Sequence, residues 1–473
     1  MRDSMSEISE MHTVVAVCTA PGQAGIAVVR MSGPMAYAIA DTFCADAAVK
    51  PSQMDTGTFR LFRLRDPADG GLIDEALVLA FRSPHSYTGE DVVEFQTHGG
   101  RVPVMRVMKA LIACGAEPAG PGEFSRRAFL NGRMDLSMAE AVMDVIGAQS
   151  ERAGRAAAEQ LGGSLGRRLD ASYDALMEVC ADIEASLDFA DDESNSVLEP
   201  AGIPERLDSV RENLSELAAT WREGVLLREG ALVVLSGIPN AGKSTLFNAM
   251  LGVLRSIVTD IPGTTRDSIE ETMILDGIPL RMVDTAGLRN TESSIERLGV
   301  DRAVKLVQSA DLNLRLIDMA ADHEHQLGWM RDGSYAPSKT LVILSKADIA
   351  RGGSVQTLPR RIRGAGYDVV VVSVKDGSGL EELKSAMKRK IVGDGFHDAA
   401  QGVAVSERHH GLLEKALTEI DGALSLYGSD GGDSAVFCAQ ALRAAAESLS
   451  QITGRVYSED LLDRIFSRFC IGK

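Results

Sequence analysis

Apolar residues recur at different intervals in different parts of the chain, and these intervals predict its elements. In residues 13–104 the apolar runs are short and separated by turns rich in glycine and proline, which is typical of strands joined by tight connections. The predicted strands are 26–30, 58–64, 76–81 and 92–97, and the predicted helices are 34–43 and 104–114. This mixture indicates an N-terminal α+β domain.

A helical pattern follows. From residue 138 to about 189, apolar residues keep a spacing near 3.6 residues, and residues 207–221 resume it. Near the other end of the chain, helices are predicted at 406–426, 435–453 and 458–469. These helical stretches flank a segment, 231–390, in which strands and helices alternate as in a parallel sheet. Because the ends of a domain often lie close together, one helical domain with the α/β domain inserted into it is the economical interpretation, and two independent helical units are the alternative.

The stretch GIPNAGKS at residues 237–244 lies between a predicted buried strand and a predicted helix. Its glycines allow a tight turn whose N–H groups point at phosphate oxygens, and the helix dipole favours an anion there. Lys243 can reach the β- and γ-phosphates, and Ser244 can ligate Mg²⁺. Candidate nucleotide contacts in this phosphate loop are Gly237, Asn240, Ala241, Gly242, Lys243, Ser244 and Thr245.

Later motifs follow in the order that a guanine-nucleotide domain requires, each at the end of a predicted strand. DIPGTTRD at 260–267 stands where a first switch loop belongs, and Thr265 is a second candidate Mg²⁺ ligand. In DTAG at 284–287, Asp284 can hold the water shell of Mg²⁺ and the Gly287 N–H can contact a γ-phosphate. In SKAD at 345–348, the carboxylate of Asp348 suits the two adjacent N–H donors of guanine, and SVK at 373–375 is placed to contact the base.

The sequence therefore predicts a multidomain α/β protein with an inserted Ras-like P-loop G domain, whose sheet is mixed and mostly parallel. The predicted parts are 1–133 (N-terminal α+β domain), 134–226 (helical domain, first part), 227–391 (G domain) and 392–473 (helical domain, second part). Candidate GTP contacts beyond the phosphate loop are Thr259, Asp260, Ile261, Pro262, Gly263, Thr264, Thr265, Asp284, Thr285, Ala286, Gly287, Ser345, Lys346, Asp348, Ser373, Val374 and Lys375.

Two residues bear on how hydrolysis is organised. Leu288 stands where Ras-type enzymes have a glutamine that orients water, so another group must do this. Glu292 and Glu296 are nearby acids, with a role as solvated surface acids as the alternative. Asn240 offers a side-chain oxygen beside the β/γ bridge, where a bound cation can replace an arginine finger. The alternative is that Asn240 only shapes the loop.

Composition limits the choice of partners and compartment. The net charge is −18, so overall charge does not predict a polyanion partner, and a local basic patch would be needed. Six cysteines without a C-x-x-C pair predict a reducing, cytoplasmic setting. The polar first 13 residues do not predict a signal peptide, and no apolar run reaches the length of about 20 residues that a membrane helix needs. Candidate residues for such a basic patch are Arg101, Arg106, Arg126, Arg127 and Arg133, with ordinary solvated surface as the alternative.

The nucleotide motifs GIPNAGKS, DIPGTTRD and DTAGLR resemble those of Era/TrmE-type GTPases. Three further stretches narrow the resemblance: YTGEDVVE at 87–94, PGEFSRRAFLNG at 121–132 and FCIGK at 469–473. Together they resemble the MnmE (TrmE) family of tRNA modification GTPases over essentially the whole chain.

The resemblance implies a homodimer joined through N-terminal domains that bind 5-formyl- or 5,10-methylene-tetrahydrofolate as a one-carbon source. It implies that the FAD-dependent enzyme MnmG (GidA) is the partner, and that C5 of the wobble uridine of certain tRNAs is modified. It also implies that K⁺-dependent pairing of two G domains stimulates GTP hydrolysis. Two other classes stay open: an RNA-associated GTP switch like Era, and a scaffold whose G domain only changes dimer shape.

Residue roles follow from the same resemblance. The implied K⁺ ligands are Asn240, Thr259, Ile261 and Thr264, and the implied Mg²⁺ ligands are Ser244 and Thr265. The catalytic candidates are Glu296 as the water-activating acid, Asn240, Arg266 and Cys470, the last associated with modification. The implied folate contacts are Arg30, Glu94, Arg133 and Lys473. The structural alternatives are a strand-end surface charge for Arg30, a sheet-edge acid for Glu94 and a small buried apolar group for Cys470.

The sequence departs from the family pattern at two positions. Ser345 replaces the usual asparagine of the base motif, which shortens the side chain that braces the pocket. Arg133 stands where lysine is common, and its forked guanidinium changes the contact geometry.

Overall fold

The structure is a computed structural model that describes residues 12–44, 46–188, 202–254, 270–284, 305–331, 335–349, 354–393, 405–427 and 434–473. It divides into two compact units. The first contains Met1–Met143, Gln160–Leu214 and Leu412–Lys473, and the second contains Asp144–Glu159 and Ser215–Gly411. In the part of the chain that is described, no helix is long and apolar enough to cross a membrane.

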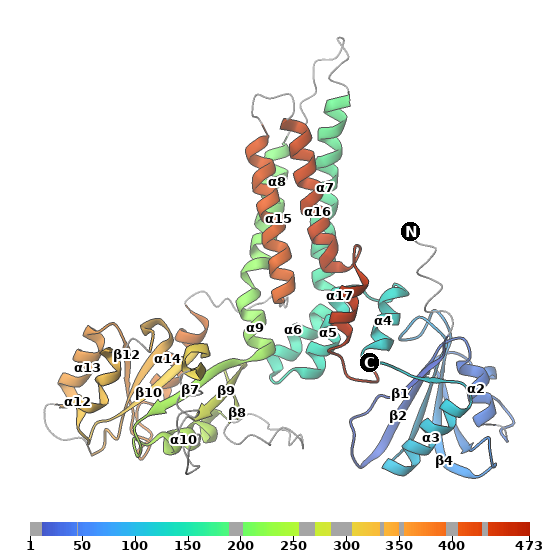
Figure 1. The fold of residues 1–473 in the computed structure, drawn as a ribbon, viewed down its shortest axis with the longest axis horizontal. Helices are drawn as coiled ribbons and strands as arrows, with labels where there is room; N and C mark the ends of the chain where they lie inside the picture. The colour runs from blue at the N-terminus through green and yellow to red at the C-terminus, as the bar shows by residue number, and fades with distance from the viewer. Residues whose placement is uncertain are drawn as a thin grey trace. The chain divides into compact units, whose positions relative to one another are not determined.

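The N-terminal part of the first unit is a sheet with one face covered by helices (Figure 1). The strand order is β3-β4-β5-β2-β1-β6, antiparallel except for the β1–β6 pair. The strands are β1 Val14–Val17, β2 Ala24–Ser32, β3 Thr58–Arg65, β4 Leu72–Phe81, β5 Val92–Gly99 and β6 Glu117–Pro118, and the covering helices are α2 Ala36–Phe43 and α3 Arg101–Ala113. A short 3-10 turn, η1 Pro51–Gln53, lies beside α2.

Alternation along the strands explains why only one face of this sheet is covered. In β4, Ala76, Val78 and Ala80 are buried in the core, while the residues between them point to the other face. On the edge strand β3, Phe59 and Leu61 are 64% and 65% exposed, although both are large and apolar. The face opposite the helices is therefore open at this edge.

Helices from both ends of the chain build the rest of the first unit (Figure 1). Helix α7 packs along α16, and the Cys180 thiol of α7 contacts the carbonyl oxygen of Ala439 in α16. Segments before and after the inserted unit thus share one core, which confirms a single helical domain and excludes two independent helical units. The helices are α4 Glu123–Leu130, α5 Leu136–Gly147, α7 Ser164–Asp188, α8 Ile203–Ala219, α15 Glu407–Leu426, α16 Ser434–Thr453 and α17 Glu459–Phe466. Helix α6, Glu151–Leu161, belongs mostly to the second unit.

The second unit contains a six-stranded sheet of order β12-β11-β10-β7-β9-β8. Only β8 is antiparallel, so the sheet is mixed and mostly parallel, as expected. The strands are β7 Ala231–Gly237, β8 Glu270–Leu275, β9 Ile278–Asp284, β10 Leu312–Asp318, β11 Thr340–Ser345 and β12 Asp368–Val371. Its helices are α9 Trp221–Glu229, α10 Lys243–Leu254, α12 His323–Gln326, α13 Ser354–Gly364 and α14 Leu380–Val392, with 3-10 turns η3 Gly328–Arg331 and η4 Pro337–Lys339.

Strands β8 and β9 form a hairpin whose tip contacts the segment Asp144–Glu159. The turn residues Asp276 and Gly277 have φ of 49° and 82°, the backbone that an Asp-Gly hairpin turn requires. The hydroxyl of Ser150 donates to the carbonyl oxygen of Gly277 over 2.5 Å. This contact helps to explain why Asp144–Glu159 belongs to the same unit as the second sheet.

Most predicted elements are present, with shifted ends. Strand β4 begins at Leu72, before the predicted start at 76, and α17 ends at Phe466 instead of 469. Beyond α17 the chain turns so that Phe469 packs into the core formed by α4, α5 and α17. The domain boundaries at 133, 226 and 391 stay predictions.

Candidate functional site

The phosphate loop joins β7 to α10. Its backbone has positive φ angles at two glycines and at Asn240. Gly237 has a φ of 156°, and a Cβ there would lie 2.8 Å from the carbonyl oxygen of Leu316. Gly242 has a φ of 93° and Asn240 a φ of 62°. Asparagine tolerates this left-handed region better than most residues. Part of the role of Asn240 is therefore to shape the loop, and its exposed side chain remains available to a ligand.

Lys243 lies over this loop. Its amine donates to the carbonyl oxygens of Gly237 at 3.0 Å and Ile238 at 2.8 Å, and its side chain is buried. Ser244 is exposed at the start of α10, where the helix dipole favours anions. Asp284, at the end of β9, pairs in register with Leu235 of β7, two residues before the loop begins. The Lys243 amine therefore lies at the end of β7, next to the strand that ends with Asp284.

Ser345 connects the base motif, residues 345–348, to the phosphate loop. It is the residue that replaces the asparagine usual in the family. The buried Ser345 hydroxyl lies 2.7 Å from the carbonyl oxygen of Ala241 and 3.2 Å from that of Ile317. Although serine is shorter than asparagine, it still spans from β11 to the phosphate loop. The shorter side chain thus keeps a contact between the base motif and the phosphate loop.

The two base-contacting motifs also meet. The Ser373 hydroxyl donates to the Asp348 carboxylate over 3.3 Å, while that carboxylate remains exposed. Lys346, with a φ of 59°, donates to Asp318 at the end of β10 over 2.6 Å. The arrangement leaves Asp348 able to accept from a guanine base.

Several predicted site residues lie outside the described residues, and their roles stay predictions. They are Thr259, Asp260, Ile261, Pro262, Gly263, Thr264, Thr265, Arg266, Thr285, Ala286, Gly287, Leu288, Glu292 and Glu296.

A second candidate site lies in the N-terminal sheet. Arg30 of β2 stands opposite Glu94 of β5, and its Nε donates to the Glu94 carboxylate over 2.7 Å. The guanidinium lies over the rings of Tyr87 and Phe124, 4.8 Å and 5.4 Å from their centroids. Its Nη1 is buried and has no hydrogen-bond partner among the residues that the structure describes. We call these four residues, Arg30, Glu94, Tyr87 and Phe124, the Arg30 site.

The position of these residues rules out their structural alternatives. Arg30 and Glu94 lie inside strands β2 and β5, which are interior strands of the sheet, and their side chains are only 14% and 15% exposed. A strand-end charge and a sheet-edge acid are thus wrong. Burial opposes the charge on Arg30, but the neighbouring Cys18 and the Glu94 carboxylate outweigh it and raise the pKa of Arg30. The guanidinium therefore remains charged and offers a buried donor.

Residues 469–473, which we call the tail, dock beside the Arg30 site. The Phe124 N–H donates to the backbone oxygen of Lys473 at 3.1 Å, and Pro121 forms an antiparallel backbone bridge with Ile471. Gly472 packs on β1 so closely that a Cβ would lie 2.9 Å from Cα of Cys18. Burial raises the pKa of the Cys18 thiol, and the nearby cations Arg30 and Lys473 oppose this rise.

The remaining tail and folate candidates are placed differently. Cys470 is exposed, so the interpretation as a small buried apolar group is wrong. Arg133 is exposed and packs against Gly89. A Cβ on Gly89 would lie 3.2 Å from Cγ of Arg133. The structure brings Lys473 toward Arg30 and Glu94, while Arg133 lies at the loop that carries Tyr87.

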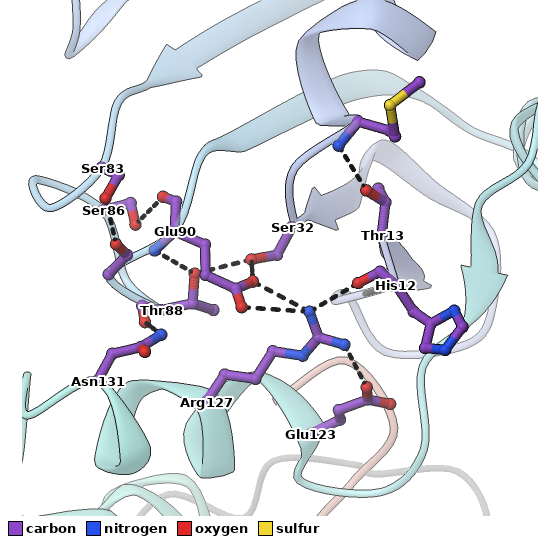
Figure 2. A network of polar contacts seen from close by, with 12 residues as sticks. His12, Thr13, Ser32, Ser83, Ser86, Thr88, Glu90, Glu123, Arg127 and Asn131 are labelled. Atoms are coloured by element: carbon purple, nitrogen blue, oxygen red, sulfur yellow. Dashed lines mark hydrogen bonds and ion pairs between the residues drawn. The ribbon is translucent and has the colours of Figure 1, made fainter. Parts of the chain in front are cut away.

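Sequence reasoning missed Tyr87 and Phe124 as parts of the site, although both lie in motifs that stand out in the sequence. It also misplaced two of the arginines proposed for a basic patch. Arg127 is 6% exposed and pairs with Glu90 and Glu123, as Figure 2 shows. Arg126 pairs with Glu459 and Asp463 of α17.

Comparison with known proteins places both sites in one family. The profile of the GTP-binding protein TrmE N-terminus matches residues 13–133, and that of the MnmE helical domain matches residues 136–470. The chain is 37% identical over 481 residues to a tRNA modification GTPase MnmE of Psychrobacter arcticus, covering 99% of this chain and 98% of that protein. It is 39% identical over 471 residues to the protein of the same name from Thermosynechococcus vestitus, covering 98% and 99%.

Among solved structures, the chain is similar to the G domain of the T. maritima FeoB iron transporter, at 27% identity and a TM-score of 0.26, over 34% of this chain and 98% of that one. The two profiles and the full-length relatives are sufficient for assignment: the chain belongs to the MnmE family of tRNA modification GTPases.

Proposed function

We propose that this chain hydrolyses GTP and, with the FAD-dependent protein MnmG (GidA), modifies C5 of the wobble uridine of certain tRNAs in the cytoplasm. A tetrahydrofolate derivative, 5-formyl or 5,10-methylene, supplies the one-carbon unit. Family membership over nearly the full length supports the GTPase role in tRNA modification. The Arg30 site supports the folate step.

The observation that carries the folate proposal is the unpartnered Nη1 of Arg30. A buried donor without a partner is costly, so a site that leaves one is well suited to a ligand with acceptors. Folates combine a flat ring, N–H donors and carboxylates. Tyr87 and Phe124 offer aromatic surface, Glu94 accepts from ring N–H groups, and Lys473 adds a cation. Arg133 is proposed to contact the ligand from the loop side.

In the G domain, the chain's own residues hold the nucleotide and organise its charge. Lys243 is proposed to exchange its bonds with the loop carbonyls for phosphate oxygens, and Asp348 to accept from guanine. Ser244 and Thr265 are the proposed Mg²⁺ ligands. K⁺ is proposed to bind Asn240, Thr259, Ile261 and Thr264. Glu296 is proposed to activate water, with Arg266 as a further catalytic candidate.

A second copy of this chain is the proposed partner of the N-terminal sheet. Phe59 and Leu61 alternate on one strand, so they lie on the same open face. Two exposed large apolar side chains on an edge strand support an interface there rather than a free surface. Pairing of two G domains in the same dimer would then complete each K⁺-dependent site.

The described helices that follow α14 are α15, α16 and α17, and α16 packs with α7. This arrangement favours the tRNA-modification function over an Era-like switch, which would place a separate RNA-binding module there.

The test is mass spectrometry of wobble nucleosides in a strain that lacks this protein and carries either the wild-type chain or Arg30→Met. We expect the wild-type chain to restore the modified uridine and Arg30→Met to leave it absent, with GTP hydrolysis retained. Arg206→Met is the control, because Arg206 is also ion-paired but lies in α8, where its partners are Asp182 and Glu178 of α7. Full restoration by Arg30→Met would contradict the role of this site.

A further inference from the structure

We infer that Arg127 is a positioning residue for the Arg30 site, an inference that rests on the proposed function and adds a residue to it. Arg127 lies in α4 and does not touch Arg30. It holds two structures that border the Arg30 site: the loop 83–90, which carries Tyr87, and the docked tail. Figure 2 shows the guanidinium of Arg127 between Glu90, which belongs to the loop, and Glu123, which belongs to α4.

The first arm of Arg127 fixes the loop. Its Nη1 lies 3.0 Å from the Glu90 carboxylate, and the same carboxylate accepts from Ser32 over 2.7 Å. Ser32 also pairs with the hydroxyl of Thr88 at 2.7 Å. Ser32 stands two residues after Arg30 in β2, so both side chains point to the same face of the sheet. The loop is thereby held against the strand that presents Arg30.

The second arm fixes the start of α4. Nη2 of Arg127 donates to one Glu123 oxygen over 2.8 Å, and the other Glu123 oxygen accepts from the Gly120 N–H over 2.7 Å. This closes the turn from which the next N–H groups reach the tail: Gly122 donates to Cys470 over 3.4 Å, and Phe124 donates to Lys473. The register of the tail therefore depends on the turn that Glu123 holds.

The two arms converge on the aromatic wall of the Arg30 site. Tyr87 belongs to the loop and Phe124 to α4, and the Tyr87 hydroxyl bonds to Ser125 over 2.8 Å. Both rings lie under the Arg30 guanidinium. Because Arg127 bonds to both carboxylates, one side chain sets the spacing of the loop and the helix.

Burial makes this arrangement sensitive to loss of the guanidinium. The Arg127 side chain is 7% exposed and that of Glu90 is 15% exposed. Removing one member of a buried pair leaves its partner charged and uncompensated, which moves the surrounding groups. Glu90 would then turn toward water and take the loop with it.

The test has one readout that needs no ligand and one that does. The first readout is amide hydrogen exchange of the full chain, measured in residues 83–92, 119–125 and 467–473. For Arg127→Met we expect exchange to rise about tenfold in all three, with β7 unchanged, since the loss of a buried pair typically has an effect of this size or larger. Glu90→Gln should raise exchange in 83–92, and Glu123→Gln in 119–125 and 467–473. Unchanged exchange in Arg127→Met overturns the inference.

The second readout is calorimetric titration with 5-formyltetrahydrofolate. We expect Arg127→Met to weaken binding about tenfold and Arg127→Lys, which keeps the charge, to recover part of it. The kcat of GTP hydrolysis should stay at the wild-type value. Arg206→Met is again the control for general destabilisation: an equal loss of affinity there, or no recovery with lysine, overturns the inference. If the wild-type chain does not bind the folate, the proposed function fails, while hydrogen exchange still decides the role of Arg127.

Discussion

The hydroxyl of Ser345 lies 2.7 Å from the carbonyl oxygen of Ala241, and this contact joins the base motif to the phosphate loop. Both groups are buried. Guanine selection and phosphate binding thus share a single hydrogen bond, made here by a hydroxyl where the family usually has an amide.

We predict that Ser345→Ala weakens GDP binding by about 5- to 30-fold, because it removes a buried hydrogen bond and leaves the Ala241 carbonyl unsatisfied, at a cost of about 1–2 kcal/mol. Titration with a fluorescent GDP analogue measures the change in Kd. Ser309→Ala is the control, because the Ser309 hydroxyl is exposed and bonds only to its own helix turn at Leu306. A Kd equal to that of the wild-type chain would show that the contact carries no binding energy.

The backbone of Asn240 separates two explanations of this residue. With a φ of 62°, alanine would be strained there, while glycine would not. We predict that Asn240→Gly keeps nucleotide binding but loses the faster hydrolysis expected in K⁺ over Na⁺, since the side chain with its oxygen is removed while the backbone conformation stays accessible. Asn240→Ala should in addition weaken binding, by about 1 kcal/mol of backbone strain.

The two explanations are separated by measuring the rate of GTP hydrolysis in K⁺ and in Na⁺, together with the nucleotide affinity, for both variants. If Asn240→Gly keeps the K⁺ preference while Asn240→Ala loses it, the residue acts by shaping the loop and not as a cation ligand.

The phosphate loop could be predicted from sequence because its chemistry lies in eight consecutive residues between a strand and a helix. The Arg30 site could be found only by family resemblance. Its members come from strands β2 and β5, the loop 83–90 and α4, the tail docks beside them, and no local pattern records that these meet. Arg127 shows the limit most clearly. Two consecutive arginines, Arg126 and Arg127, predict exposed charge, yet the helix directs Arg127 toward the carboxylates of Glu90 and Glu123.

The place of Asp144–Glu159 could not be predicted for a similar reason. Its apolar spacing is that of any helix, so periodicity joins it to the helical domain. Its partners are far away in sequence, and they include the carbonyl oxygen of Gly277, the carboxylate of Glu223 and the apolar side chain of Leu227.

The cysteines should differ strongly in reactivity with iodoacetamide at pH 8. Burial raises the pKa of the Cys44 thiol to about 12, so only about one molecule in 10⁴ carries the reactive thiolate at this pH. Burial also raises the pKa of Cys18, whereas Cys470 is exposed. We expect Cys470 to be alkylated first and Cys44 last.

A time course read by peptide mass spectrometry checks this order, and Cys470→Ser should remove the fast phase without changing the others. Alkylation of Cys44 at the rate of Cys470 would contradict the burial of Cys44 under α2.

The last prediction concerns Ser150, whose hydroxyl has two roles. It accepts from the Ala153 N–H over 3.1 Å, which caps the start of α6, and it donates to the carbonyl oxygen of Gly277 at the tip of the β8–β9 hairpin. Ser150→Ala removes both bonds, and we predict a loss of about 1–2 kcal/mol in the free energy of unfolding of the second unit. Thermal unfolding measures the loss. Ser150→Thr keeps a hydroxyl and should recover most of it.

Hydrogen exchange at the hairpin locates the effect. Since β9 runs from this tip to Asp284, exchange in residues 272–280 should rise in Ser150→Ala, while β12, at the opposite edge of the sheet, should not change. Ser425→Ala is the control, because the exposed Ser425 hydroxyl bonds only within its own helix. If Ser150→Ala and Ser425→Ala are equally stable, the hairpin tip is held by the packing of Gly277 against Arg152 and not by the Ser150 hydroxyl.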